Sequence, residues 1–211
     1  MKRIAAIFLS VTLVLALSAC GKKPEDPYAG ISNPVATITM SDGSQMRFEL
    51  KPAEAPNTVA NFIELANSGF YDGLEVFRVV AGVLIQSGDP QNDGTGDPGY
   101  AIAGEFSDNG FANNLSHVRG TISMCRQSDY NSAGSQFFIL QGSYPEYDGR
   151  YAAFGSIMDE QSLATLDAIA AQPVDGNYVP LNRQIIESIR VDTFDQKYEA
   201  VTTERPKEEE K

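Results

Sequence analysis

The central part of the chain, residues 71–154, consists of short apolar runs that are interrupted every few residues by glycine, aspartate, asparagine or proline. None of these runs is long enough for a helix, and their spacing is typical of short antiparallel strands joined by loops. A set of such strands exposes unpaired edges unless the sheet closes on itself. We therefore predict a mainly β fold, built as a closed barrel.

The flanking segments add a hairpin, two helices and a final strand. Residues 34–50 contain two runs around an Asp-Gly turn, which predicts a β-hairpin. Residues 55–70 carry apolar side chains at helical spacing, with proline near the start and glycine just past the end. Residues 159–172 have the same spacing, and residues 184–191 have the pattern of a last strand. No repeat and no second domain is indicated.

The N-terminus has the pattern of an export signal. Lys2 and Arg3 precede an apolar run, residues 4–17, that is shorter than the roughly 20 residues needed to span a membrane. The run ends in Leu-Ser-Ala-Cys, which resembles the lipobox of bacterial lipoproteins. The resemblance implies that residues 1–19 are removed and that Cys20 carries lipid. An ordinary secretory signal that happens to end in cysteine is the alternative.

This interpretation divides the chain into four parts. After the signal peptide, residues 20–32 are the lipidated cysteine and a flexible tether, residues 33–192 form one domain, and residues 193–211 form a charged, disordered tail. With Cys20 lipidated, Cys125 has no partner in the chain, so we expect no internal disulfide. We expect an exported protein, lipid-anchored to the bacterial cell membrane and facing outward.

The charge of the chain excludes two kinds of partner. Its 28 acidic and 16 basic residues give a formal net charge of −12. So acidic a protein is a poor ligand for nucleic acid and for anionic headgroups. The predicted membrane contact therefore depends on the lipid, and because no oligomeric interface is indicated, we expect a monomer.

Two features suggest cofactor or metal chemistry but do not support it. The glycine-rich stretch at residues 94–99 fits a dinucleotide-binding pattern, but no helix follows it to receive a pyrophosphate, so a surface loop is predicted. His117 is the only histidine, too few for a metal cluster, and we predict a structural hydrogen-bonding role for it. Cys125 is predicted to be a small buried side chain. No cofactor and no metal is expected.

Polar side chains interrupt the apolar strands at positions where a core strand carries none. Arg78 lies in an apolar strand and Gln86 in the next one. In the stretch Gly-Ser-Gln-Phe-Phe-Ile-Leu, the alternation of a strand places Gln136 and Phe138 on the face opposite to the core. A surface arginine whose stem lies on apolar surface is the alternative for Arg78.

Several segments occur in a characteristic order, among them "FRVVAGVLIQSGDP", "GTGDPGYAIAGEF", "HVRGTISM" and "GSQFFI". Together they resemble the cyclophilin family of peptidyl-prolyl cis-trans isomerases, from Asn33 to about Val191. The resemblance implies a closed eight-stranded antiparallel barrel capped by two α-helices. It also implies a reaction without proton transfer, which suits a chain with few acid–base candidates.

The resemblance assigns a role to individual residues. Arg78 matches the catalytic arginine, and Gln86 matches the glutamine that holds the arginine and the substrate backbone. The implied substrate-binding residues, which form the proline pocket and its neighbouring subsite, are Phe77, Val83, Leu84, Cys125, Arg126, Gln136, Phe138, Tyr147 and Tyr151.

Four positions depart from the family pattern. Val83 stands where a phenylalanine is usual, Phe77 where a histidine is usual, and Arg126 where an asparagine is usual. Glu146 stands near the place of the pocket tryptophan. The loss of a ring at Val83 predicts a shallower proline pocket.

The sequence is therefore compatible with two functions. The first is a peptidyl-prolyl cis-trans isomerase that acts on proline-containing segments of exported proteins at the outer side of the membrane. The alternative is a catalytically weak module that binds proline-containing segments, or a holdase chaperone.

Overall fold

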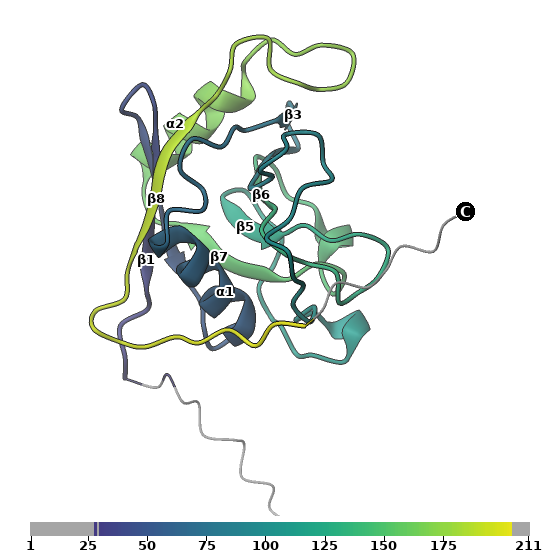
Figure 1. Cartoon of the computed structure of the whole chain (residues 1–211). Helices are drawn as coiled ribbons and strands as arrows, with labels where there is room; N and C mark the ends of the chain where they lie inside the picture. The colour runs from purple at the N-terminus through teal and green to yellow at the C-terminus, as the bar shows by residue number, and fades with distance from the viewer. Residues whose placement is uncertain (1–27, 29, 204–211) are drawn as a thin grey trace, which may run out of the picture.

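The computed structural model describes Tyr28 and residues 30–203. In this part of the chain eight strands form one antiparallel sheet in the order β3-β4-β6-β5-β7-β2-β1-β8. The strands are β1 Val35–Met40, β2 Gln45–Leu50, β3 Arg78–Val80, β4 Leu84–Ser87, β5 Thr121–Met124, β6 Phe137–Leu140, β7 Ala153–Ile157 and β8 Ile186–Asp192. Figure 1 shows the sheet curling around the interior, with α1 and α2 at different ends.

The helices lie where the apolar spacing predicts them. They are α1 Pro56–Asn67, α2 Glu160–Ala170, and two short 3-10 helices, η1 Ser107–Asn109 and η2 Pro145–Tyr147. After α1 the chain turns at Gly69, whose φ of +81° is a conformation that glycine adopts without strain. At the start of α2 the side chain of Asp159 accepts a hydrogen bond of 2.8 Å from the backbone N–H of Ser162.

The sheet is curled but does not close, so the prediction of a closed barrel is wrong. Strands β3 and β8 are the two ends of the sheet and do not pair with each other. An isolated bridge between Glu75 and Ile185 and three backbone hydrogen bonds join residues 73–76 to residues 184–186, but β3 itself pairs with no residue of β8. Closure fails because β3 is three residues long and the loop before β8 takes its free edge, where the N–H of Val79 donates to the carbonyl oxygen of Tyr178 at 2.8 Å.

Strand β6 is buried on both faces, and this positions the site. Phe137 and Ile139 belong to the main core inside the curled sheet. Phe138 and Leu140 point to the other face, where they form a separate apolar cluster with Leu84 of β4. The alternation predicted from the sequence is therefore confirmed, and the outer face of β4 and β6 carries its own small core.

The C-terminal segment follows the surface of the domain beyond β8. Residues 193–203, for which the sequence predicts disorder, are described and hydrogen-bonded, for example through Asn57, whose amide oxygen accepts a 2.7 Å bond from the N–H of Val201. The segment is thus docked beside the start of α1 where a frayed tail is predicted, and residues 204–211 lie outside the described part.

The predicted signal peptide at residues 1–19 and the lipidation site at Cys20 also lie outside the described residues. Within the described part, none of the helices combines the length and the apolar character that crossing a membrane requires.

Candidate active site

A row of polar side chains crosses the outer face of the sheet. Arg78 on β3 pairs in register with Gln86 on β4, and Gln86 in turn pairs with Phe138 on β6. The guanidinium of Arg78 donates to the side-chain oxygen of Gln86 at 3.2 Å, and the Gln86 amide donates to the side-chain oxygen of Gln136 at 3.0 Å. The structure therefore brings together three of the predicted polar residues in one hydrogen-bonded chain.

The glycine-rich loop at residues 94–99 anchors the far end of this row. The amide nitrogen of Gln136 donates to the carbonyl oxygens of Gly94 and Gly96, at 3.1 and 2.9 Å. A Cβ at position 96 would lie 1.9 Å from a carboxylate oxygen of Asp89, so only glycine fits there. The sequence predicts a surface loop here, but its part in holding Gln136 depends on long-range contacts that the glycine pattern does not reveal.

A hollow of about 210 Å³ with a mixed aromatic and polar lining lies beside the guanidinium of Arg78. Its lining consists of Arg78, Leu84, Gln86, Cys125, Arg126, Phe138, Tyr147 and Tyr151. Phe138 forms its centre, with the rings of Tyr147 and Tyr151 set edge-on at centroid distances of 5.9 and 5.6 Å. Aromatic and aliphatic walls beside the two arginines suit a small ring attached to a polar backbone.

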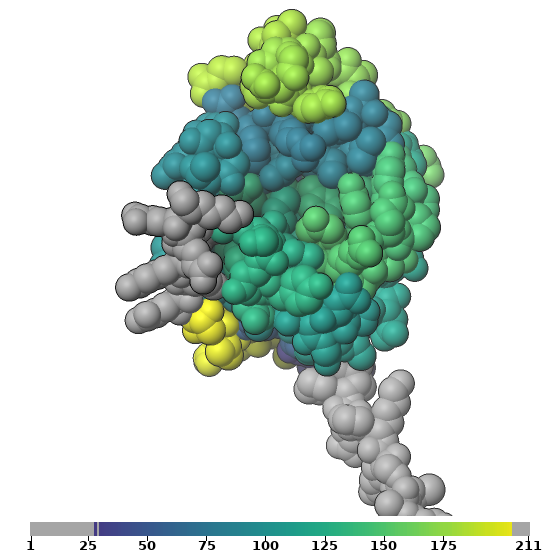
Figure 2. All heavy atoms as spheres, turned by 90° about the vertical axis from the view of Figure 1, so that its right-hand side faces the viewer, coloured from purple at the N-terminus to yellow at the C-terminus, as the bar shows by residue number. Residues whose placement is uncertain are grey.

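A second hollow of about 120 Å³ continues the first. It shares Gln86, Cys125 and Arg126 with the first hollow and is otherwise lined mostly by backbone and small polar side chains of residues 132–136 and of the glycine-rich loop. The two hollows thus form one groove, hereafter the substrate groove. In Figure 2 the segments that carry it, coloured blue, teal and green, meet around a hollowed face of the molecule.

Two predicted substrate-binding residues do not line the groove. Phe77 is buried and is absent from the lining of both hollows, although its backbone N–H donates to the carbonyl oxygen of Gln86 at 3.1 Å. Val83 is half-buried and packs against the outer cluster of Leu84, Phe138 and Leu140 without reaching the hollow. The other seven predicted substrate-binding side chains line one or both hollows.

His117 has the structural hydrogen-bonding role that the sequence predicts, and it lies beneath the floor of the groove, which the sequence does not predict. Its ring stacks on Phe138 at a centroid distance of 6.1 Å. One ring nitrogen lies 2.9 Å from a carboxylate oxygen of Asp148 and the other lies 3.0 Å from the hydroxyl of Ser123. Because a carboxylate only accepts, Nδ1 carries the proton and Nε2 accepts from Ser123. Burial lowers the pKa of His117, against the opposing effect of Asp148, which favours the neutral ring.

Cys125 is a wall of the groove and not a nucleophile. Burial raises the pKa of its thiol to about 12, although the charge of Arg78 acts in the opposite direction. The thiol is therefore protonated at neutral pH, and a protonated thiol reacts poorly. The prediction of a small buried side chain is confirmed only in part, because Cys125 is half-buried and lines both hollows.

Arg126 is held flat between three aromatic rings. Its guanidinium carbon lies 5.3, 4.7 and 4.9 Å from the ring centroids of Phe106, Tyr130 and Tyr151. Its Nε and Nη1 donate to the backbone oxygens of Arg150 and Gln127. The sequence places Arg126 in the groove, but the rings that fix it come from three separate segments.

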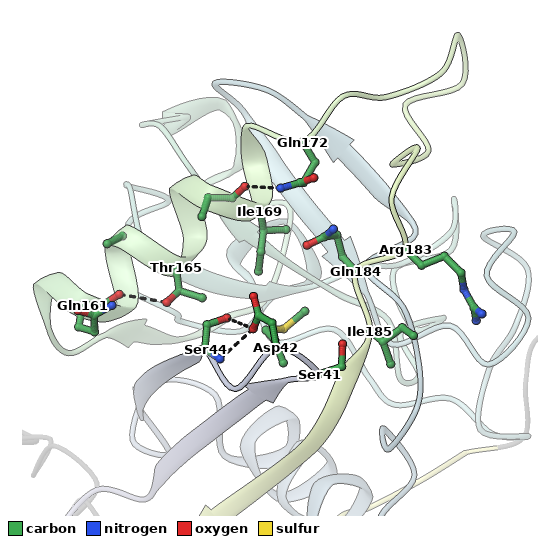
Figure 3. Close-up of a pocket in the computed structure, with 13 residues that line it drawn as sticks. Ser41, Asp42, Ser44, Gln161, Thr165, Ile169, Gln172, Arg183, Gln184 and Ile185 are labelled. Carbon is green, nitrogen blue, oxygen red and sulfur yellow. Dashed lines mark hydrogen bonds between the residues drawn. The ribbon is translucent and has the colours of Figure 1, made fainter.

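A larger hollow of about 310 Å³ lies on another side of the domain, between the β1–β2 turn, α2 and the segment before β8 (Figure 3). Its two charged side chains already have partners in the structure. Asp42 accepts hydrogen bonds from the backbone and hydroxyl of Ser44, and Arg183 extends away to pair with Glu75. The remaining polar lining consists of neutral amides and hydroxyls, so this hollow has no arginine that lacks a carboxylate partner among the described residues.

Comparisons with known proteins identify the family. The sequence matches the family described as cyclophilin type peptidyl-prolyl cis-trans isomerase/CLD over residues 35–191. It is 40% identical over 132 residues to a peptidyl-prolyl cis-trans isomerase of Synechococcus elongatus, covering 63% of this chain and 86% of that protein. It is 43% identical over 118 residues to peptidyl-prolyl cis-trans isomerase B of Bacillus subtilis, covering 56% and 79%.

A solved structure supports the same conclusion. The structure of a Cryptosporidium parvum cyclophilin type peptidyl-prolyl cis-trans isomerase, determined in the presence of the dipeptide Ala-Pro, matches with a TM-score of 0.66 and 31% identity, covering 75% of this chain and 98% of that one. The profile match spans the whole sheet together with both helices, from β1 to β8. This chain therefore belongs to the family of cyclophilin-type peptidyl-prolyl cis-trans isomerases.

Proposed function

We propose that the chain isomerises X-Pro bonds in exported polypeptides, with Arg78 as the catalytic residue and Phe138 as the floor of the proline pocket. The observation that carries this proposal is the position of Arg78. Its half-buried guanidinium lines the same hollow as Phe138 and is tied to Gln86. A cation fixed at the rim of an apolar pocket is placed to act on the backbone of a residue whose side chain fills the pocket.

The chemistry of the bond explains why one cation is useful. Rotation about a peptide bond has a barrier of about 18–20 kcal/mol because the nitrogen lone pair is shared with the carbonyl group. For X-Pro, uncatalysed exchange takes tens to hundreds of seconds. At the twisted transition state the lone pair returns to nitrogen, and a guanidinium then donates to it more strongly than in the ground state. Such differential binding is what lowers a barrier.

The hydrogen bond from Arg78 supplies only part of the acceleration. A hydrogen bond to a charged group contributes about 1.5–3 kcal/mol, which corresponds to about a ten- to hundredfold rate increase. The remainder comes from gripping the proline ring against Phe138, Leu84 and Tyr147 while the preceding carbonyl group rotates, in a site from which water is displaced. Gln86 and Gln136 hold Arg78 and the substrate backbone in register. No proton is transferred, so no acid or base is required.

The test compares the wild-type protein with Arg78→Ala on a proline tetrapeptide, by a protease-coupled assay or by NMR exchange. We expect kcat/KM to fall by about ten- to a hundredfold because the transition-state hydrogen bond is lost. Circular dichroism checks that the fold is kept. Arg47→Ala is the matched control, since Arg47 is exposed on β2 and pairs with Asp159 at 3.8 Å. Equal activity in wild type and Arg78→Ala would contradict the proposal and favour a proline-binding module.

We further propose that the enzyme is exported and held at the outer side of the membrane by lipid on Cys20. The support is the basic start, the short apolar run and the Leu-Ser-Ala-Cys end of the first twenty residues. Two or more acyl chains anchor a protein stably, whereas one chain is marginal. Expression of the wild type and Cys20→Ser with radiolabelled palmitate tests this. Label and membrane fractionation are expected only for the wild type, and equal fractionation without label would contradict it.

A further inference from the structure

The arginines of the described part of the chain fall into two groups. Five of the seven lie within 4.0 Å of a carboxylate oxygen, namely Arg47, Arg119, Arg150, Arg183 and Arg190. The other two, Arg78 and Arg126, have no carboxylate within that distance among the residues that the structure describes. Both line the hollow beside Phe138.

Burial alone favours the opposite pattern, because a partly buried arginine needs a carboxylate partner more than an exposed one does. The five paired arginines have side chains that are 41–70% exposed, where water already stabilises their charge. Arg78 and Arg126 are only half-exposed residues in a chain of net charge −12. A partly desolvated charge without a counter-ion is costly. With 28 acidic residues available, the absence of a carboxylate at both sites marks a place that an outside anion can fill.

Arg126 is already fixed in the orientation that binding needs. Three rings hold the plane of its guanidinium, and two of its nitrogens donate to backbone oxygens. A guanidinium has five N–H donors. The donors on Nη2 have no acceptor among the described residues. Little side-chain entropy is therefore lost when a carboxylate binds, and preorganisation of this kind increases affinity.

The position of Arg126 relates it to the proline pocket. It lines the hollow that takes the proline ring and also the adjoining hollow of about 120 Å³. An extended chain advances at most about 3.3–3.6 Å per residue. A residue one or two positions from the proline therefore falls within the adjoining hollow or at its rim.

We propose that Arg126, together with the charge of Arg78, forms a carboxylate-binding subsite, so that the enzyme selects proline segments carrying an acidic side chain one or two residues from the proline. The inference rests on the proposed function, since it names the class of substrate for the same groove. Carboxylate and guanidinium form short, charge-assisted and often bidentate hydrogen bonds. A neutral glutamine of similar size and shape gains much less from the same site.

The experiment measures kcat/KM for matched peptides that carry Glu or Gln at each of the two positions before and after the proline. The assays use about 0.15 M salt, where charges beyond about 8 Å are largely screened. For one position we expect the Glu peptide to be isomerised about tenfold more efficiently than its Gln partner. In Arg126→Gln this ratio should fall to about one, whereas in the control Arg47→Gln it should stay at its wild-type value. In the wild type, raising the salt to about 1 M should also reduce the ratio.

The outcomes separate this inference from the proposed function. If both peptides are isomerised with equal kcat/KM at every position, the acidic selectivity is overturned and the isomerase remains. If neither peptide is isomerised above the uncatalysed rate, the proposed function fails first. A merely structural role of Arg126 would lower both rates equally in Arg126→Gln and leave the ratio unchanged, which also overturns the inference. If Arg126→Gln does not fold, the wild-type protein alone tests the inference. A Glu/Gln ratio of kcat/KM that is the same at about 0.15 M and about 1 M salt would contradict an ion pair and overturn the inference.

Discussion

Two hollows on the same domain differ in size and in charge. The hollow beside α2 has a volume of about 310 Å³, against about 210 Å³ for the proline pocket of the substrate groove. In the larger hollow, Asp42 is bonded to Ser44 and Arg183 is paired with Glu75. In the groove, Arg78 has no carboxylate partner among the described residues.

Volume therefore does not identify the reactive face of this molecule. A hollow whose only arginine is already paired with a carboxylate can hold a ligand but has no free cation for a transition state. A cation that is fixed and uncompensated stabilises charge that develops in the substrate, without reorganisation at that moment. The groove has this property, and the hollow beside α2 does not.

Removing the amide that holds Arg78 is expected to lower the catalytic activity strongly. Gln86→Leu keeps the approximate shape of the side chain but loses the bonds to Arg78 and Gln136. We expect kcat/KM for a proline tetrapeptide to fall about tenfold, since a hydrogen bond to a charged group is lost and the arginine is released. Gln172→Leu, the same change in the hollow beside α2, should leave kcat/KM unchanged. A comparable fall in kcat/KM in both variants would contradict the functional difference between the two hollows.

Filling the groove is expected to have a smaller effect of opposite sign. Val83 packs against the outer cluster without lining the proline pocket, so Val83→Phe would add a ring at its edge. We expect kcat/KM to rise about fivefold, corresponding to about 1 kcal/mol of added apolar contact with the substrate. Val201→Phe, at a position that is 72% exposed on the C-terminal segment, is the matched control. No change in Val83→Phe would mean that Tyr147 and Tyr151 already close the pocket.

The smallest effect concerns pH, and it arises from a buried group beneath the groove, His117. Burial lowers the pKa of His117, the only histidine of the chain, below its ordinary value near 6.5. The unfolded chain therefore binds a proton at higher pH than the folded one. Stability is full above about pH 6.5 and declines as the pH falls from there towards the lower pKa of the folded state.

Denaturant unfolding at a series of pH values tests this expectation. Between about pH 6.5 and 5 the midpoint of the wild type should fall with pH more steeply than that of His117→Gln, which has no imidazole to titrate. Parallel pH profiles for the two proteins would show that protonation of this ring does not weaken the floor beneath Phe138.

Local patterns were sufficient to predict most of the fold. The two-residue period of β6 separates Phe137 and Ile139 in the core from Phe138 on the outer face. The Asp-Gly turn and the helical spacings likewise locate the hairpin and both helices. These features depend on residues close together in the sequence, which is why they can be recognised there.

Features that depend on distant contacts were not predictable. Ala55 has no side chain to cap α1, and the carboxylate of Glu105 accepts the N–H bonds of Asn57 and Thr58 instead. The open seam of the sheet likewise depends on a loop that meets β3 from nearly a hundred residues away, through Tyr178. No hydrophobic period or sequence motif reveals such long-range contacts.

The candidate site, too, was predictable where it depends on local pattern and not where it depends on long-range contacts. The row from Arg78 to Gln136 follows from the resemblance and from strand alternation, and the structure brings its members within hydrogen-bonding distance. The anchoring of Gln136 by the glycine-rich loop and the aromatic clamp on Arg126 arise only when separate loops fold over the groove. The absence of carboxylate partners for the two groove arginines, among the described residues, is likewise visible only in three dimensions.

The most direct test of the central claim is a crystal structure of the soluble protein, without its signal peptide and lipid, bound to a proline-containing peptide. We predict that the pyrrolidine ring lies against Phe138 and that a guanidinium nitrogen of Arg78 lies within hydrogen-bonding distance of the proline nitrogen or of the backbone beside it. A peptide seated in the hollow beside α2, or a proline ring in the groove with Arg78 turned away from it, would contradict the account.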